Sequence, residues 1–476
     1  MTLVMPQMAK KMVTETENTF DNLKNSMTPS GIRSLAAFVF DAANRQLLQA
    51  SFAVALTILF VKFAAILKEM IVAWRFGTSD DLDAFTVALI IPFSLVSIVA
   101  ASFQSAFIPV YVRVQELEGN EAAQSLISNA LTLIIALFSM ALILMLLAAP
   151  IYLHYLAPAF GEQKYSLTLK LTGIIAPILI FSGISNIFGA VLNARNSFVA
   201  VSLAPLITTV LIVAALWFAA RIEALAMAVR LGAMCEVLWL GWKLRKTGIR
   251  FRLGIDIFNV KLKETLRQAA SLTLGNFLLS GIGVFSVAVA GSLAAGSVAS
   301  FSYASKLIAL PNGLLATALG ATLVPYFSRL SVQSEWQQMR TTLHRFLQLA
   351  FLLTLPIAII LMVFPQFITK HLFQRGAFAE NDVATVSTVL FCFALQLPFY
   401  VGGVLSARLL QALQMSHDLL KVSAASLLVN VVLTVILSNL FDVAGIALAV
   451  SLTYWFSFFA LYFLARKRIN LGLEIK

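Results

Sequence analysis

Apolar stretches long enough to cross a membrane recur along most of the chain. A spanning helix needs roughly 20 predominantly apolar residues. The stretches that meet this length are residues 48–74, 84–112, 125–150, 167–191, 197–220, 222–243, 267–291, 297–328, 343–364, 383–412, 418–439 and 443–465. Six of them precede and six follow a polar break. The pattern predicts an all-α polytopic membrane protein of about twelve transmembrane helices in two six-helix bundles.

The polar segments between these stretches predict the domain organisation. Lys and Arg concentrate in alternate loops, which by the positive-inside rule places both termini in the cytoplasm. The break mixes basic with apolar residues, as in a segment that lies on anionic lipid. The predicted parts are an N-terminal cytoplasmic extension (1–47), a first six-helix bundle (48–243), a basic cytoplasmic linker (244–266), a second six-helix bundle (267–466) and a cytoplasmic tail (467–476).

The composition excludes a water-soluble fold. The chain is 60% hydrophobic and 12% charged, whereas soluble domains are roughly 45–50% apolar and about 25% charged. Basic loops at the cytoplasmic surface explain the net charge of +12 without a nucleic-acid partner. Cys235 and Cys392 lack CxxC spacing, so neither a disulfide framework nor a metal site is indicated. No signal peptide is expected ahead of the first span.

Catalytic chemistry is not indicated either. The four histidines fall in separate loops or helix ends, and G-x-S-x-G, H-E-x-x-H and Gly-rich phosphate loops are missing from the sequence. We therefore expect no enzyme activity, no cofactor and no ATP-driven pump. A secondary transporter, or a flippase driven by an ion gradient or the membrane potential, fits this pattern.

An internal repeat supports the division into two bundles. An ungapped offset of 216 residues places Pro109 on Pro325 and Arg113 on Arg329, at the ends of two apolar segments. Phe85 and Ala88 likewise fall on identical residues. Repeats with the same orientation place their binding site at the interface between the halves, so we expect a central cavity there.

Ionisable side chains inside the spans mark candidate site residues, because a charge at the bilayer centre costs roughly 2.5–3.5 kcal/mol on insertion scales. Lys62, Lys68 and Glu69 lie in the first span, Asp83 begins the second and Lys306 lies in the eighth. They predict a cationic cavity suited to phosphate groups. An alternative is that Lys68 and Glu69 only extend to the outer headgroups.

Three further charges lie within spans and are additional candidates for the cavity. Arg230 and Glu236 share the sixth span, although a spacing of six residues puts them on different faces. Arg408 lies near the inner end of the tenth span. A membrane carboxylate such as Glu69 or Glu236 could instead bind Na⁺ or H⁺ in an ion-coupled transporter.

Three stretches carry a resemblance to a known family. They are KLIALPNGLLATALGATLVPYFSR at residues 306–329, LKEMIVAWRFG at 67–77 with DAF at 83–85 and AFIP at 106–109, and LFQRGAF at 372–378. In order and spacing they resemble the MviN/MurJ family of lipid II flippases, within the multidrug/oligosaccharidyl-lipid/polysaccharide exporter superfamily.

The resemblance implies a V-shaped pair of six-helix bundles around a central cavity, in the bacterial inner membrane. It implies export of a polyprenyl-diphosphate-linked glycan, such as the lipid II precursor of peptidoglycan, to the periplasmic leaflet by alternating access. The arginines that line the cavity in this family correspond to Lys62, Lys68 and Lys306, and the family's aspartate corresponds to Asp83. Charge is kept, but the bidentate fork of arginine is lost.

Two departures from the family keep other functions open. Residues 93–105 lack the paired arginines and acidic residue of the family's second helix, and the chain ends after the twelfth predicted span, without two further helices. An exopolysaccharide or O-antigen lipid intermediate is therefore an alternative substrate. An ion-coupled drug antiporter of the same superfamily and a non-transporting membrane scaffold are further alternatives.

Overall fold

The structure is a computed structural model that describes residues 42–195, 197–249, 260–320 and 323–474. The predicted N-terminal extension lies largely outside these residues, as does the middle of the predicted basic linker. The chain divides into two compact units, residues 1–61 and 62–476. All interactions discussed below belong to the second unit, in which residues 62–245 are called the N-terminal half and residues 260–474 the C-terminal half.

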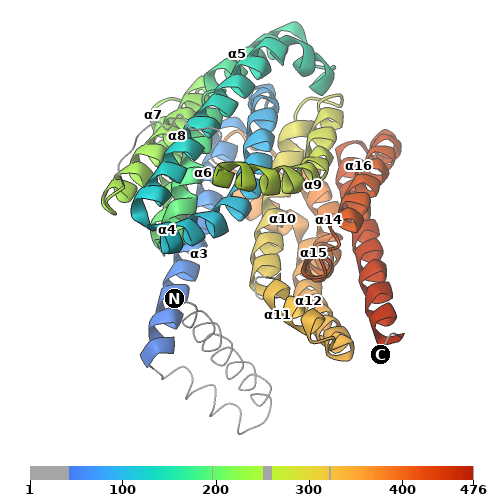
Figure 1. Cartoon of the computed structure of the whole chain (residues 1–476). Helices are drawn as coiled ribbons and strands as arrows, with labels where there is room; N and C mark the ends of the chain where they lie inside the picture. The colour runs from blue at the N-terminus through green and yellow to red at the C-terminus, as the bar shows by residue number, and fades with distance from the viewer. Residues whose placement is uncertain (1–41, 196, 250–259, 321–322, 475–476) are drawn as a thin grey trace. The chain divides into compact units, whose positions relative to one another are not determined.

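The N-terminal half consists of helices joined by short turns (Figure 1). Long apolar runs favour helices here, because a helix pairs its backbone groups within itself. The helices are α3 (Ala42–Phe76), α4 (Asp80–Leu156), α5 (Glu162–Ile175), α6 (Ile178–Ala194), α7 (Phe198–Phe218) and α8 (Ile222–Arg245).

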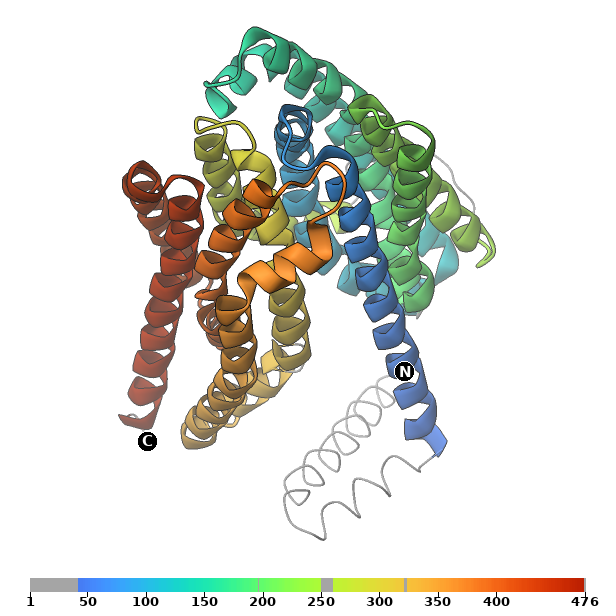
Figure 2. The same cartoon turned by 180° about the vertical axis from the view of Figure 1, so that it is seen from behind.

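The C-terminal half is also helical throughout its described residues. Its helices are α9 (Val260–Ala290), α10 (Ser297–Gly320), α11 (Leu323–Val332), α12 (Trp336–Val363), α13 (Pro365–Phe373), α14 (Glu380–Ala394), α15 (Leu397–Ala412) and α16 (Ser416–Glu474). Figure 2 shows the short helix α13 turned away from the direction of α12. The chain changes direction where Pro365 begins α13. Proline is favoured in the first turn of a helix, where its missing N–H is not needed.

Within the described residues, seven helical segments are long and apolar enough to cross a membrane, or eight if α14 and α15 form one bent span. Two of the seven each contain two predicted spans. Gly119 breaks α4 with a φ of 87°, and Phe441 and Asp442 break α16. These breaks divide each long helix into two predicted spans. The described parts of α3 and α10 lie outside this apolar set and correspond to the first and eighth predicted spans. They carry Lys62, Lys68 and Glu69 on α3 and Lys306 on α10.

Two predicted spans are each divided between two helices. The span predicted at residues 167–191 consists of α5 and α6, with a break at Ala176 and Pro177. The span predicted at residues 383–412 consists of α14 and α15, which meet at an angle of 40° ahead of Pro398. Proline lacks the N–H that would continue the helical ladder, and this explains why both breaks occur at prolines.

Large apolar side chains cover the outside of the molecule. Leu147, Phe218, Leu352 and Phe463 are each at least two-thirds exposed, as are several others along the spans. In water such a surface would be unfavourable, but lipid tails are as apolar as leucine. The exposed apolar surface therefore supports a fold that is embedded in the bilayer.

Buried apolar side chains form three clusters. One cluster draws residues from both halves, including Val72 and Phe85 from the first and Tyr303 and Val386 from the second. A second cluster belongs almost entirely to the N-terminal half and is centred on α4 and α6. The third belongs to the C-terminal half. The two halves thus share one core in part of their length and keep separate cores elsewhere.

Candidate transport site

The charges of α3 meet a charge of the C-terminal half. Glu69 lies between two lysines, with its Oε1 2.8 Å from Lys68 Nζ and its Oε2 2.9 Å from Lys306 Nζ. Glu69 is 12% exposed and Lys306 is 48% exposed, so the group is reachable from one side. One carboxylate between two ammonium groups leaves a net positive charge. The structure therefore brings together three of the residues predicted from the sequence, which we call the lysine–glutamate triad.

Lys62 extends the positive surface along α3. It is exposed, and it lies seven residues before Glu69 on the same helix. At a rise of about 1.5 Å per residue, this spacing corresponds to roughly 10 Å, or two turns. Lys62 thus shares a face of α3 with Glu69, as expected from the sequence.

Asp83 is held by the first turn of α10. Its Oδ2 accepts hydrogen bonds from the Gly296 backbone N–H at 2.7 Å and from Lys164 Nζ at 2.8 Å, and its Oδ1 accepts one from the Ala299 N–H at 2.7 Å. The side chain is 1% exposed. The first N–H groups of a helix have no partner within the helix and attract negative charge. Asp83 therefore caps α10 from the opposite half of the protein.

The segment after α3 makes further bonds to the C-terminal half. The Ala377 backbone N–H donates to the Trp74 carbonyl oxygen at 2.9 Å, and the Tyr303 hydroxyl donates to the Gly77 carbonyl oxygen at 3.2 Å. The Thr78 hydroxyl donates to the Asp382 carboxylate. Together with the triad and Asp83, these bonds join residues 69–83 to residues 296–306 and 377–382. We call this set the gate cluster.

The gate cluster coincides with the core that the two halves share. Val72, Phe85, Tyr303 and Phe378 belong to that core and lie within or next to the bonded segments. By the predicted topology, this end of the helices faces the periplasm. The arrangement can hold the two halves together at one end through polar bonds that an anion could break.

The remaining predicted residues lie apart from the triad. Arg230 is exposed on α8. Glu236, also on α8, accepts a hydrogen bond from the Thr208 hydroxyl of α7. Arg408 is exposed on α15 and donates to the Gln411 side chain at 3.1 Å. A role for these three residues, and for Asp83, in binding the substrate stays a prediction.

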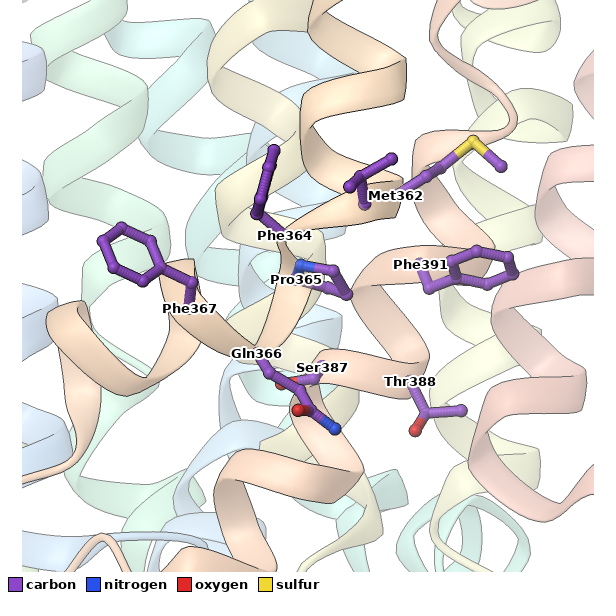
Figure 3. Close-up of a pocket in the computed structure, with 9 residues that line it drawn as sticks. Met362, Phe364, Pro365, Gln366, Phe367, Ser387, Thr388 and Phe391 are labelled. Atoms are coloured by element: carbon purple, nitrogen blue, oxygen red, sulfur yellow. The ribbon is translucent and has the colours of Figure 1, made fainter.

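Two surface pockets are lined by residues other than those of the triad. One of about 480 Å³ lies where α12 meets α13 and is lined by apolar residues such as Phe364, Phe367 and Phe391, with Ser387 and Thr388 from α14 (Figure 3). Another of about 550 Å³ lies beside Lys164, next to the gate cluster. Within the described residues, no group of three or more His, Cys, Asp or Glu side chains is placed to hold a metal.

Sequence reasoning missed several partners of the gate cluster. Lys164 lies between two predicted spans, where a solvent-exposed cation is expected. In the structure it is 13% exposed and forms an ion pair with Asp83. Gly296 has a φ of 81° and sits where a Cβ atom would lie 2.7 Å from the Thr78 carbonyl oxygen. A glycine just before a predicted helix was the available signal for a close backbone approach. Thr78 and Asp382 carried no signal, because they are 304 residues apart.

Solved structures share this fold. A lipid II flippase in an inward closed conformation matches with a TM-score of 0.75 and 21% identity over 87% of both chains. An inward-facing multidrug resistance transporter of the MATE family matches with a TM-score of 0.77 and 16% identity, over 88% of this chain and 99% of that one. The chain has the fold of these two membrane transporters, and the predicted fold class is confirmed.

Family and sequence comparisons narrow this class. The family model described as "Lipid II flippase MurJ" matches residues 72–476. A probable lipid II flippase of Rhizobium tropici is 24% identical over 86% of this chain and 78% of its own length, and a lipid II flippase of Burkholderia cenocepacia is 26% identical over 84% and 80%. The chain belongs to the MurJ family of lipid II flippases. The matched range includes Asp83 and Lys306 but begins after Lys62, Lys68 and Glu69.

Proposed function

We propose that this protein is a multi-pass flippase of the bacterial inner membrane that carries lipid II, a polyprenyl-diphosphate-linked glycan, from the cytoplasmic to the periplasmic leaflet. Membership of the flippase family supports the substrate class. The observation that carries the proposal is the lysine–glutamate triad, in which Glu69 joins Lys68 of its own half to Lys306 of the other. Both termini are cytoplasmic in this proposal.

The diphosphate of the substrate competes with Glu69 for the two lysines. A diphosphate carries more negative charge than a carboxylate and offers more acceptor oxygens, so Lys68 and Lys306 bind it more strongly. Once Glu69 loses its bonds to Lys306, one link between the halves is removed. Binding of the substrate therefore favours separation of the halves at the gate cluster and release toward the periplasm, which is alternating access.

Lys62 gives the lipid a second position on α3. It lies about two turns from the triad, toward the predicted cytoplasmic side, and its side chain is exposed. A diphosphate that enters from the cytoplasmic leaflet meets Lys62 first and the triad afterwards. Lysine suits such a transfer because it binds phosphate as a point charge, without the fixed fork of arginine.

Transport against the unfavourable transfer of a charged headgroup needs an energy source. The membrane potential supplies about 2.3 kcal/mol per elementary charge at 100 mV. An ion gradient is the other source, and it requires a site that binds Na⁺ or H⁺ inside the membrane. The proposal includes coupling to one of these two sources.

Replacing Lys306 tests the proposal. We expect Lys306→Ala to lower the rate at which the purified protein flips fluorescent lipid II in vesicles by at least about tenfold, because loss of one charge-assisted contact costs roughly 1.5–3 kcal/mol. Lys370→Ala removes an exposed lysine of α13 in the same half and should leave the rate unchanged. Equal rates for Lys306→Ala and the wild type would refute a role of the triad in binding diphosphate.

Exchanging the charges of Glu69 and Lys306 distinguishes a role of Lys306 in the gate from a role in binding the diphosphate. The double variant Glu69→Lys with Lys306→Glu restores an ion pair between the halves, so we expect thermal stability close to that of the wild type. It also puts a carboxylate where the diphosphate should bind, so flipping should remain lost. Recovery of flipping in the double variant would show that Lys306 acts only through its bond to Glu69.

Two other substrates belong in the same assay. The departure from the family at residues 93–105 favours testing an O-antigen-type lipid beside lipid II, and the MATE-like fold favours testing gradient-dependent dye efflux. Preferential flipping of the O-antigen-type lipid would make the protein a polysaccharide exporter. Dye efflux without lipid flipping would make it an antiporter.

A further inference from the structure

A carboxylate and a hydroxyl meet between two helices at mid-membrane depth. Glu236 is the fifteenth of the 24 residues of α8, and Thr208 is the eleventh of the 21 residues of α7. Both helices are candidate membrane spans. At about 1.5 Å per residue, each residue lies within roughly 4 Å of the middle of its helix. The pair is therefore far from both headgroup regions.

The Thr208 hydroxyl donates a hydrogen bond of 2.5 Å to Oε1 of Glu236. Other threonines in the spans donate to their own helix, four residues back: Thr209 bonds the Pro205 carbonyl oxygen, and Thr172 bonds that of Thr168. Thr208 instead reaches across to α8. Its bond is thus a specific contact between two helices.

The close approach of α7 and α8 depends on the residues around Glu236. A Cβ atom at Gly232 would lie 2.7 Å from the Thr208 Cα, so only glycine allows this crossing. The Trp239 indole N–H donates to the Ala200 carbonyl oxygen at 3.2 Å. Gly232, Glu236 and Trp239 recur at the i, i+4 and i+7 spacing of one helix face. Glu236 therefore points at α7.

Glu236 has no counter-ion among the described residues. The helices α6 and α7, which pack against α8, contain no ionisable side chain. On α5, Lys164 binds Asp80 and Asp83, and Lys170 binds Glu223 at the outer end of α8. Arg230 on α8 lies six residues from Glu236 and thus about 240° round the helix.

The other titratable groups of the helices that pack against α8 form no ion pair with Glu236 in the described residues. On α4, the Tyr111 hydroxyl accepts a bond from Arg195 at 3.0 Å. The remaining groups of the packed helices are Asp81, Arg113, Glu116, Glu118, Glu121, Tyr152, His154 and Tyr155 of α4, Glu162 and Tyr165 of α5, and Cys235, Lys243 and Arg245 of α8. No ion pair joins any of the basic groups to Glu236 in the described part of the chain.

An ionised carboxylate without a counter-ion is unfavourable in the membrane, so Glu236 must bind a cation or a proton. A metal cation such as Ca²⁺ takes six to eight oxygen ligands, and Mg²⁺ takes six. One carboxylate and one hydroxyl supply too few. Transporters hold Na⁺ with carbonyl oxygens of unwound helices, whereas α7 and α8 are continuous here. A proton needs only the carboxylate, and the hydroxyl of Thr208 can donate to Oε1 whether Oε2 is protonated or not. Glu69 differs, because Lys68 and Lys306 balance its charge.

We propose that Glu236, hydrogen-bonded to Thr208, is a proton-binding site that takes up and releases a proton during each transport cycle. This inference deepens the proposed flippase function and rests on it, since it identifies the coupling ion. Deprotonation puts a charge into the crossing of α7 and α8 and favours entry of water there. Protonation restores the tight crossing, so the proton gradient can bias the conformation of the N-terminal half.

Proton binding can be tested without transport. Dicyclohexylcarbodiimide modifies protonated carboxyl groups in apolar surroundings, and mass spectrometry locates the modified residue. We expect modification of Glu236 in the full-length protein at acidic pH, declining as the pH rises. Glu236→Gln should lose it, whereas the control Glu223→Gln, at the exposed end of the same helix, should keep it. No modification of Glu236 at any pH, or modification that does not depend on pH, would overturn the proposal.

Coupling is tested by flipping of lipid II in vesicles with an imposed pH gradient. The wild type should flip faster with the gradient than without it. Glu236→Gln, which keeps the shape and the bond from Thr208, should flip at one rate in both conditions, while Glu236→Asp and Glu223→Gln should still respond. An unchanged response in Glu236→Gln would contradict the inference. A wild type that flips no lipid II would contradict the flippase function, and the labelling titration would still decide whether Glu236 binds a proton.

Discussion

Asp83 is the most constrained charged side chain of the gate cluster. Three donors from two other segments converge on its two oxygens, and it is 1% exposed. Its fixed geometry suits a residue that sets how the halves meet at the gate. Residues of the triad are more exposed and can exchange partners, so they suit contact with the substrate.

The bonds of Asp83 predict the effect of removing its charge. In Asp83→Asn, the amide oxygen can accept from only one side, and the amide nitrogen faces a donor that has lost its acceptor. We expect a loss of about 1–3 kcal/mol, because a buried donor is left unpaired, and hence a lower midpoint of thermal unfolding. Asp81→Asn, at an exposed neighbouring position, is the control. Equal midpoints for both variants would show that the cap of α10 adds no stability.

At the scale of elements, the N-termini of α4 and α10 meet as equivalent parts of the internal repeat. Asp83 of α4 bonds Ala299 of α10, and the two are separated by 216 residues, which is the offset of the sequence repeat. Equivalent positions of two repeats come together only near the axis that relates them. The gate cluster is therefore built around that axis, where small rotations of the halves change few contacts.

Gly296 makes this meeting of helices possible. Its φ of 81° is unfavourable for other residues, and a Cβ atom would meet the Thr78 carbonyl oxygen at 2.7 Å. We expect Gly296→Ala to cost about 1–3 kcal/mol, as is usual for a residue held in a strained conformation, and to lower the thermal midpoint. Gly283→Ala adds a Cβ to open space in α9 and should be neutral or stabilising. A Gly296→Ala variant as stable as Gly283→Ala would contradict the close approach.

The elements themselves were largely predictable from the sequence. The spans predicted at residues 197–220 and 222–243 correspond to α7 and α8 within two residues, because short polar turns interrupt long apolar runs there. The helical continuation between residues 113 and 124 was missed. That region is charged and was interpreted as a loop, but only Gly119 leaves the helical conformation.

The site was predictable only in part. Lys68, Glu69 and Lys306 were identified as charges inside apolar spans, and the structure brings them together. A charge in an apolar span can be recognised from the sequence of that span alone, because it is costly in the membrane. A partner that lies far away in the sequence cannot be recognised from one segment. The capping of α10 by Asp83 joins residues more than 200 positions apart, and the bond between Thr208 and Glu236 needs the geometry of a helix crossing.

For the whole molecule, alternating access requires the gate cluster to separate in each cycle. Thr78 and Asp382 offer a way to prevent this, since their side chains are hydrogen-bonded to each other across the halves. Cysteines at both positions would bring two sulfur atoms within reach of a disulfide after small adjustments. We expect the oxidised double variant to stop flipping lipid II in vesicles and the reduced form to resume it.

The control for this lock is each single cysteine variant, which cannot form the bond between the halves. The native Cys235 and Cys392 are free thiols, so the singles also report any effect of oxidation at those positions. A lock that stops flipping while lipid II still binds would indicate that the substrate reaches its site from the opposite, cytoplasmic end. If the oxidised double variant flips at the wild-type rate, the lipid does not pass between residues 69–83 and 377–382, and a path along the outer surface of the helices would have to replace alternating access.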